Sequence, residues 1–200
     1  MFKFLKYFIG VLFVPKKTLI NLIEDSKKIK YSIFLMFFIM CLFSINMTLL
    51  VIFKVNATIP ILFLKVTPEN YHFWILVLSN PLHFFLFIMT AGTIQFFIKI
   101  FDGKGTYDDT LVMSIYILSA SFAFYWLFEL IIAIYLIQTP NVPSIVPVII
   151  EISMGIILVW QIFLLPLGIK IVHKLNRLQS FIIALLSLIP YWVFLVVFYG

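Results

Sequence analysis

Long apolar runs, rather than alternating or amphipathic segments, dominate the hydrophobic pattern of the chain. Five runs reach the roughly 20 residues that a helix needs to cross a hydrocarbon core about 30 Å thick. They cover residues 31–53, 72–101, 111–137, 148–169 and 181–199. Strands of a membrane barrel are short, about 10 residues, and alternate in polarity. The pattern therefore predicts an all-α polytopic membrane protein, a bundle of five transmembrane helices.

The segments between these runs are short and polar. Residues 102–110 (DGKGTYDDT) hold two glycines and three aspartates, residues 138–147 hold three prolines, and residues 170–179 are basic. Proline interrupts helical hydrogen bonding, so the second of these segments is a natural break. No linker is long enough to separate two domains. We expect one transmembrane domain over residues 31–200, preceded by an amphipathic, basic, cytoplasmic segment over residues 1–30.

The first 30 residues carry an apolar stretch that is too short to span a membrane. Residues 1–14 (MFKFLKYFIGVLFV) lack the small-residue cleavage site of a signal peptide and continue into Pro15. They predict an interfacial helix whose lysines face anionic lipid. Proline suits the first turn of a second helix, with an apolar patch formed by Leu19, Ile20, Leu22 and Ile23. Two other interpretations stay open: packing on the inner ends of the bundle, and a surface for a specific partner.

Composition excludes several classes of protein. The chain is 64% hydrophobic and only 11% charged, whereas about a quarter of the residues in a soluble domain are charged. So few charges cannot cover a soluble core. A single cysteine, Cys41, excludes a disulfide scaffold. The net charge of +6 is better explained by membrane topology than by a nucleic-acid partner, and we expect none.

The basic residues are divided unequally between the two sides of the predicted bundle. Twelve of the 14 precede the first run or lie in and beside the segments 102–110 and 170–179, whereas Lys54 and Lys65 lie on the other side. By the positive-inside rule, the N-terminus is cytoplasmic and the C-terminus is outside. The expected location is the cell membrane in a prokaryote and an ER- or Golgi-type membrane in a eukaryote. The bilayer is the expected partner, with anionic lipids or other membrane proteins at the basic inner face.

Three ionisable residues fall inside the predicted spans: His83, Glu129 and Glu151. Such groups are costly in a membrane and are functional candidates by default. Helix rise places all three in the outer half of the bundle, where a cluster can carry protons or bind a cation. In the alternative interpretation Glu151 is interfacial, Glu129 is protonated or hydrogen-bonded to a neighbouring helix, and His83 only packs.

Small residues predict tight helix packing. Ser119 and Ala123 form a small-x-x-x-small pair, Gly92 lies at a similar depth, and Gly155 offers the fourth span the same close approach. Motifs for catalysis, metal binding or a cofactor are missing, and Gly103–Gly105 lacks the spacing of a phosphate-binding loop. We therefore expect no cofactor and no enzymatic activity.

Three segments together resemble the Yip1 domain family. Residues 13–35 combine a proline with a basic helix before the first span, and residues 160–190 combine a tryptophan, a glycine, a basic loop and a returning span. Residues 101–121 begin with the family's aromatic-x-G-K-G-S/T pattern. The resemblance covers residues 13–199 and implies five membrane helices. It makes one cytoplasmic loop a candidate family site, formed by Asp102, Gly103, Lys104, Gly105 and Thr106.

For eukaryotic members, the resemblance implies ER–Golgi vesicle trafficking and binding of prenylated Rab GTPases. This chain has a short inner segment, lacks a DLYGP motif, and has Ala120 where many members have the proline of a Tyr-x-x-x-Pro that would begin at Tyr116. It is more similar to bacterial and archaeal members, and Rab-type GTPase binding is not supported. Two hypotheses follow: a non-enzymatic, membrane-organising or partner-recruiting protein, and a small-solute or proton-coupled transporter or channel that uses His83, Glu129 and Glu151.

Overall fold

Seven α-helices make up the part of the chain that the computed structural model describes, namely residues 2–55, 67, 69–138 and 145–199. No strand occurs in that part. The helices are α1 (Lys3–Phe13), α2 (Pro15–Ile23), α3 (Lys28–Ile52), α4 (Tyr71–Ile100), α5 (Tyr107–Gln138), α6 (Ile145–His173) and α7 (Arg177–Tyr199). The predicted all-α class is confirmed.

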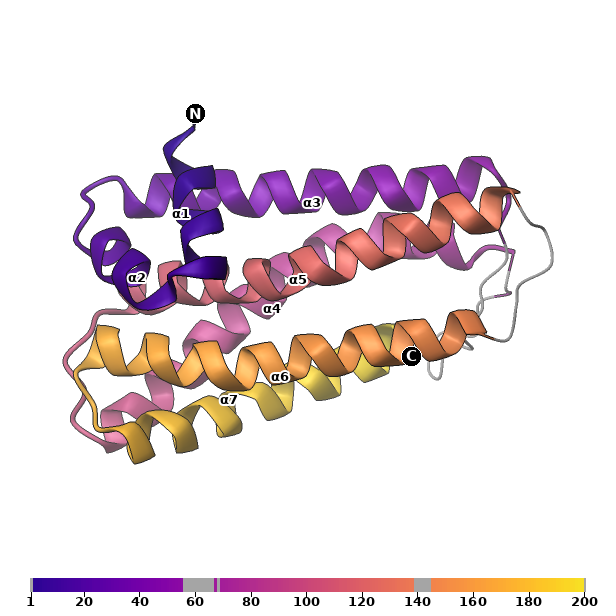
Figure 1. The fold of residues 1–200 in the computed structure, drawn as a ribbon. Helices are drawn as coiled ribbons and strands as arrows, with labels where there is room; N and C mark the ends of the chain where they lie inside the picture. The colour runs from indigo at the N-terminus through magenta and orange to yellow at the C-terminus, as the bar shows by residue number, and fades with distance from the viewer. Residues whose placement is uncertain (1, 56–66, 68, 139–144, 200) are drawn as a thin grey trace.

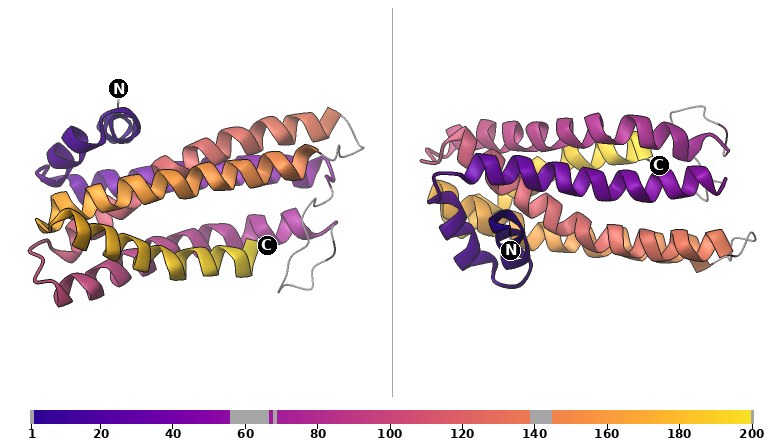
Figure 2. Two further views of the ribbon diagram at one scale, coloured as in Figure 1. Left: turned by 60° about the horizontal axis from the view of Figure 1, so that its bottom comes forward. Right: turned by 90° about the horizontal axis from the view of Figure 1, so that it is seen from above.

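Helices α3 to α7 form an elongated antiparallel bundle (Figure 1). Helices α3, α4, α5 and α6 are long and apolar enough to cross a membrane, and α7 contributes a shorter apolar stretch, Arg177–Val193. The α4–α5 and α6–α7 connections lie at the same end of the bundle as α2 (Figure 2). We call this the basic end, because the lysine-rich segments meet there.

Most of the bundle helices extend beyond the apolar runs that predicted them. Helix α6, for example, covers Ile145–His173 rather than residues 148–169. The extensions lie mainly at the helix starts, whereas α3 and α4 each end one residue before the end of their apolar run. At the end of α4, Asp102 adopts a left-handed backbone (φ 54°), and the N–H of Gly103 donates to the Ile98 carbonyl at 3.2 Å. This is the Schellman arrangement, which satisfies the last free carbonyls of a helix.

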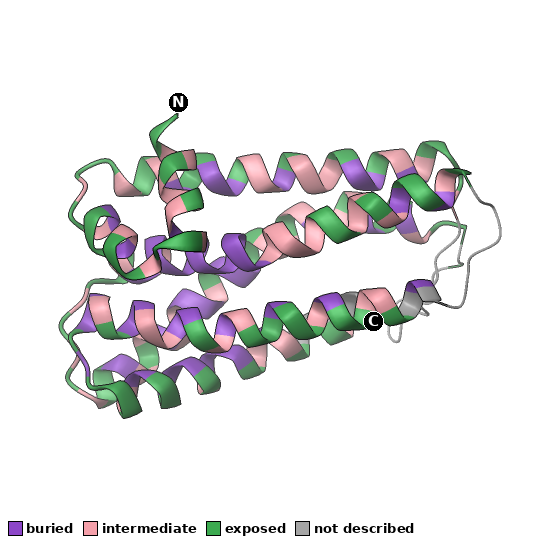
Figure 3. Cartoon of the chain, viewed as in Figure 1, coloured by how far each residue is buried: buried purple, intermediate pink, exposed green. Residues whose placement is uncertain are grey.

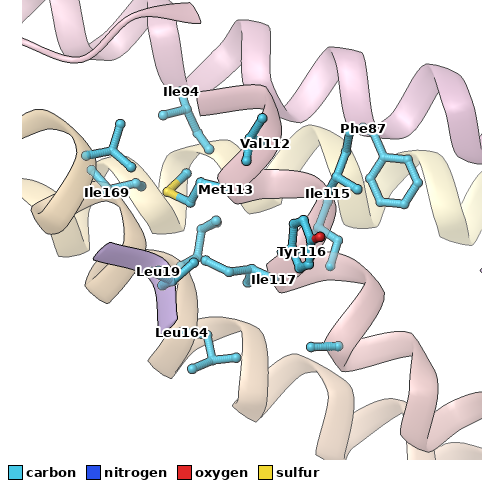
Figure 4. Packing of buried hydrophobic residues seen from close by; sticks show 14 of the residues in the cluster. Leu19, Phe87, Ile94, Val112, Met113, Ile115, Tyr116, Ile117, Leu164 and Ile169 are labelled. Carbon is cyan, nitrogen blue, oxygen red and sulfur yellow. The ribbon is translucent and has the colours of Figure 1, made fainter. Parts of the chain in front are cut away.

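The half of α5 nearer the basic end lies at the centre of the helix packing. All ten residues from 112 to 121 are buried (Figure 3). Met113, Tyr116 and Ile117 belong to a hydrophobic cluster that also takes in residues of α2, α4, α6 and α7 (Figure 4). The serines and alanines of this stretch leave room for neighbouring helices, as their sequence predicts.

The N-terminal segment folds as a helical hairpin against the bundle. Helix α1 crosses the long helices near the basic end, and α2 inserts beside α5 and α6 (Figures 1 and 2). Within the apolar patch predicted for α2, Leu19 and Leu22 are fully buried, whereas Ile20 is exposed. For α2 the structure thus has the bundle packing that was one of the open alternatives. Ile9 and Phe13 of α1 remain exposed, as does Phe2 just before it.

Two glycines show which helix faces approach closely. A Cβ built on Gly168 of α6 would lie 2.6 Å from side-chain atoms of both Ile117 and Met113, while one built on Gly155 would meet no atom within 4 Å. The expectation that Gly155 permits close packing is therefore wrong. Gly155 is exposed on α6, and Gly92, which has open space as well, makes no tight contact either. An apolar run gives no sign of which glycine faces the bundle.

Gly168→Ala is expected to be about 1 kcal/mol less stable than Gly155→Ala, because both gain the same helix propensity but only Gly168→Ala has to displace Ile117 and Met113. The matched control, Gly155→Ala, adds the same methyl group at an open position and should not destabilise. Thermal unfolding of both variants in the same detergent tests this. Equal melting temperatures for the two would contradict the packing described for α5 and α6.

Candidate functional site

The basic end is held together around one carboxylate, that of Asp109 in the first turn of α5. The Thr106 hydroxyl donates to Asp109 Oδ2 at 2.7 Å. The Asp109 N–H donates to Thr106 Oγ1 at 3.2 Å, and the Thr106 N–H donates to Asp109 Oδ2 at 3.4 Å. This reciprocal pair is a capping box, which satisfies free donors at a helix start. Asp109 Oδ1 accepts from Lys28 Nζ, and Lys28 Nζ also donates to the Ile23 carbonyl at 2.8 Å. The cluster joins the end of α2 to the starts of α3 and α5.

The candidate family loop, residues 102–106, packs against the end of α6. The Lys104 N–H donates to the His173 carbonyl at 3.2 Å. A Cβ on Gly105 would lie 2.6 Å from His173 Nδ1, and one on Gly103 would lie 2.5 Å from Ile98 Cγ2. Both glycines are thus needed for close packing. Asp102, Lys104 and Thr106 remain exposed.

His173 is a second connection beneath this loop. Its side chain is buried, and its Nε2 lies 3.0 Å from the hydroxyl of Thr110 on α5. The same hydroxyl is 2.9 Å from Gln95 Oε1 of α4. Three helices of the bundle therefore meet through polar side chains directly under the glycine-containing loop.

Helix α1 is fastened to the turn between α2 and α3 by Asp25. Lys3 Nζ lies 2.5 Å from Asp25 Oδ2, and the Tyr7 hydroxyl donates to the same oxygen at 2.8 Å. Hydrogen bonds from Lys3 and from the backbone N–H of Lys27 lower the pKa of the Asp25 carboxyl to about 2. The Tyr7 ring also meets the ring of Tyr116 edge-on, at a centroid distance of 6.4 Å.

Almost all of the twelve basic residues that were expected on the cytoplasmic side are exposed on the surface. Of those twelve, only Lys28 is not exposed, and Lys28 is engaged by Asp109. The exposed eleven are Lys3, Lys6, Lys16, Lys17, Lys27, Lys30, Lys99, Lys104, Lys170, Lys174 and Arg177. We call this set the basic face. Such a surface attracts anionic groups, and salt weakens the attraction.

The three candidate intramembrane residues lie in different surroundings. The His83 ring packs between Phe43 and Phe122, each at a centroid distance of 5.3 Å, and its Nδ1 lies 2.8 Å from the Ser79 carbonyl oxygen. Glu151 is exposed on α6. Within the described ranges, no three His, Cys, Asp or Glu side chains are close enough together to hold a metal ion.

Glu129 lies in a polar setting of its own. The Tyr125 hydroxyl is 3.4 Å from Glu129 Oε1, and the fully buried amide of Asn46 lies close to the same carboxyl group. Asn46 comes from α3, whereas both other residues come from α5. The side chains nearest to Glu129 therefore come from both α3 and α5.

A family model for the Yip1 domain matches residues 9–199, nearly the whole chain. The chain belongs to the Yip1 domain family. No curated protein and no solved structure matches it. The matched range begins within α1 and ends with α7, so the Yip1 domain of this protein includes most of the N-terminal hairpin as well as the bundle.

The contacts that organise the basic end of this Yip1 domain were not singled out from the sequence. Thr106 and Asp109 have the T-x-x-D spacing of a capping box before an apolar run, which is a readable signal. The ion pair between Lys28 and Asp109 joins residues 81 positions apart. The link between Tyr7 and Asp25 depends on how the hairpin folds. No local pattern indicates either contact.

Asp109→Ala is expected to lower the free energy of unfolding by about 2 kcal/mol, because it removes a helix cap and a charge-assisted hydrogen bond. Asp108→Ala is the matched control: Asp108 is exposed in the same first turn of α5. Chemical denaturation in mixed micelles compares the variants. Equal losses for Asp108→Ala and Asp109→Ala would refute the role given to Asp109.

The docking of α1 against the bundle should weaken at low pH. A carboxyl pKa below the ordinary value of about 3.9 means that Asp25 stabilises the docked state above that pH, and that this contribution disappears as the pH falls through about 2. Spin labels at Phe2→Cys and Leu178→Cys, in a Cys41→Ala background, report the α1 position. We expect a constant distance distribution above about pH 5 and a broader one between pH 4 and pH 2.

Two variants control this acid response. Asp25→Asn should remove the pH dependence, while Glu24→Gln, which changes the exposed neighbouring carboxyl group, should retain it. An unchanged distance distribution at pH 2 in the parent protein would show that Asp25 does not hold α1.

Proposed function

We propose that this protein is a non-enzymatic, five-span membrane protein that recruits partner proteins through its basic face. The observation that carries the proposal is that eleven of the twelve basic residues at one end of the bundle are exposed. Ten of these eleven residues belong to neither ion pair found among the described residues; Lys3 alone is paired, with Asp25, whereas the less exposed Lys28 is paired with Asp109. Acidic segments of other proteins are the chemistry that such a face attracts.

The proposed topology places the basic face on the cytoplasmic side. Helix α7 is the fifth span in this proposal: it is 23 residues long and returns antiparallel to α6 (Figure 1). The outer side has only Lys54 and Lys65 as basic residues. The positive-inside rule therefore orients the N-terminus toward the cytoplasm and the C-terminus outward.

The surroundings of the intramembrane residues favour recruitment over transport. His83 is enclosed by aromatic rings, and Glu151 is exposed on the surface of α6. Glu129 has its polar neighbours in Tyr125 and Asn46 instead. A proton or cation path needs polar groups in succession, whereas these three side chains have different neighbours.

A photo-crosslinking amino acid at Arg177 tests the proposal in native membranes. We expect discrete protein adducts from this position and none from Glu69, an exposed residue outside the basic face. The triple variant Lys16→Gln, Lys17→Gln, Lys27→Gln should lower the adduct yield, because it removes three of the positive charges that attract an acidic partner segment. Lys28 stays unchanged because it stabilises the fold.

A flux assay on reconstituted vesicles separates the two hypotheses. Recruitment predicts vesicles as tight to protons and small cations as protein-free vesicles. Flux that disappears in Glu129→Gln, together with no adducts at Arg177, would overturn the proposal and establish transport instead.

A further inference from the structure

A cavity of about 350 Å³ lies between α1 and the long helices. Its walls come from four helices: α1, the middle of α3, α4 and the middle of α5. The lining includes Leu5, Phe8, Ile9 and Leu12 of α1, together with Phe43, His83, Phe122 and Ala123. Nearly all of the lining side chains are apolar, and many are aromatic.

The depth of the cavity identifies the medium around it. Its α3 wall, residues 38–43, lies 10–15 residues past the first residue of α3, or roughly 15–22 Å along the helix axis. That is the middle of a helix long enough to cross the bilayer. At this depth the surrounding material is hydrocarbon rather than water.

Helix α1 separates this apolar space from charged groups. At 3.6 residues per turn, Leu5, Ile9 and Leu12 share one face of the helix. Lys3, Lys6 and Gly10 lie on the opposite face, where Gly10 packs against Thr18 of α2. An in-plane helix with this division turns its apolar side toward the membrane interior and its lysines toward lipid headgroups.

We propose that this cavity holds one acyl chain of an anionic phospholipid from the cytoplasmic leaflet, with the lipid phosphate beside Lys6. The leaflet assignment rests on the orientation given under the proposed function. An apolar cavity of about 150 Å³ accommodates one benzene molecule. A volume of about 350 Å³ therefore has room for roughly twice that amount of hydrocarbon, a segment of about a dozen chain carbons.

Charge at the hairpin indicates the headgroup. Residues 1–30 contain seven lysines but only two acidic residues, Glu24 and Asp25. Asp25 is already bonded to Lys3 and Tyr7. Lys6 is exposed, and neither of the two ion pairs found among the described residues includes it. An anionic phosphate complements this excess of positive charge.

Photoactivatable phospholipids test the site. The full chain is placed in lipid nanodiscs with a phosphatidylglycerol or a phosphatidylcholine that carries a diazirine on one acyl chain, and labelled peptides are mapped after illumination. We expect phosphatidylglycerol to label the segments 5–12, 38–43 and 122–127 at least about fivefold more than the lipid-facing surface around Val159, a preference of about 1 kcal/mol.

Two variants fill the cavity from opposite walls: Ala123→Phe from α5 and Ile9→Trp from α1. Each should reduce labelling of the cavity segments to the level at Val159. The matched control, Val159→Phe, adds a ring to a residue that is 52% exposed on α6 and should leave cavity labelling unchanged. Lys6→Gln should remove the preference for phosphatidylglycerol. Size-exclusion profiles establish that each variant is folded.

Uniform labelling along the lipid-facing surface, or cavity labelling that survives both filling variants, would overturn the acyl-chain site. Equal labelling by the two phospholipids in the parent protein would overturn the anionic headgroup. Both results are independent of the adducts at Arg177, so a failure of partner recruitment and a failure of the lipid site are distinguishable.

Discussion

The carboxylate of Asp109 has to be paired, and its pairing organises the basic end of this protein. A carboxylate that is mostly withdrawn from water costs free energy unless hydrogen bonds and an opposite charge compensate it. Thr106 provides the hydrogen bond and Lys28 the charge. Because Lys28 also bonds the end of α2, the same cluster fixes where α5 begins and where the hairpin docks. The buried stretch of α5, residues 112–121, follows directly after this capped first turn.

The charged residues of the basic end fall into two groups: those that hold the helices together and those that are exposed on the surface. Lys28 and Asp109 are engaged in the fold, Asp25 is engaged by Lys3 and Tyr7, and the exposed lysines around them form the basic face. The two glycines of the family loop, Gly103 and Gly105, also serve the fold, because both are needed for close packing at the end of the bundle. The proposed recruitment of partners and the proposed binding of an anionic lipid both depend on charges that the fold leaves exposed.

The helices were predictable from the sequence because a helix that crosses a membrane needs a long, continuous apolar run. Family membership was predicted from three segments in order, and the match over residues 9–199 confirms it. The face that each helix turns inward was not predictable, because a helix apolar on every side has no amphipathic period to read. The sequence therefore suggested close helix packing at Gly155, whereas Gly168 makes the close contact in the structure. For the same reason His83, Glu129 and Glu151 could be placed by depth but not by direction. The Lys28–Asp109 pair, formed across 81 residues, has no local signature at all.

The function proposed for the basic face requires that this face lie on the cytoplasmic side of the membrane. Thiol accessibility in sealed, right-side-out vesicles tests this orientation. In a Cys41→Ala background, single substitutions Lys17→Cys, Lys104→Cys and Lys174→Cys sample the basic face, and Glu69→Cys samples the other end of the bundle. We expect an impermeant thiol reagent to label only Glu69→Cys until the vesicles are opened. Labelling of any of the three basic-face positions from outside would contradict it.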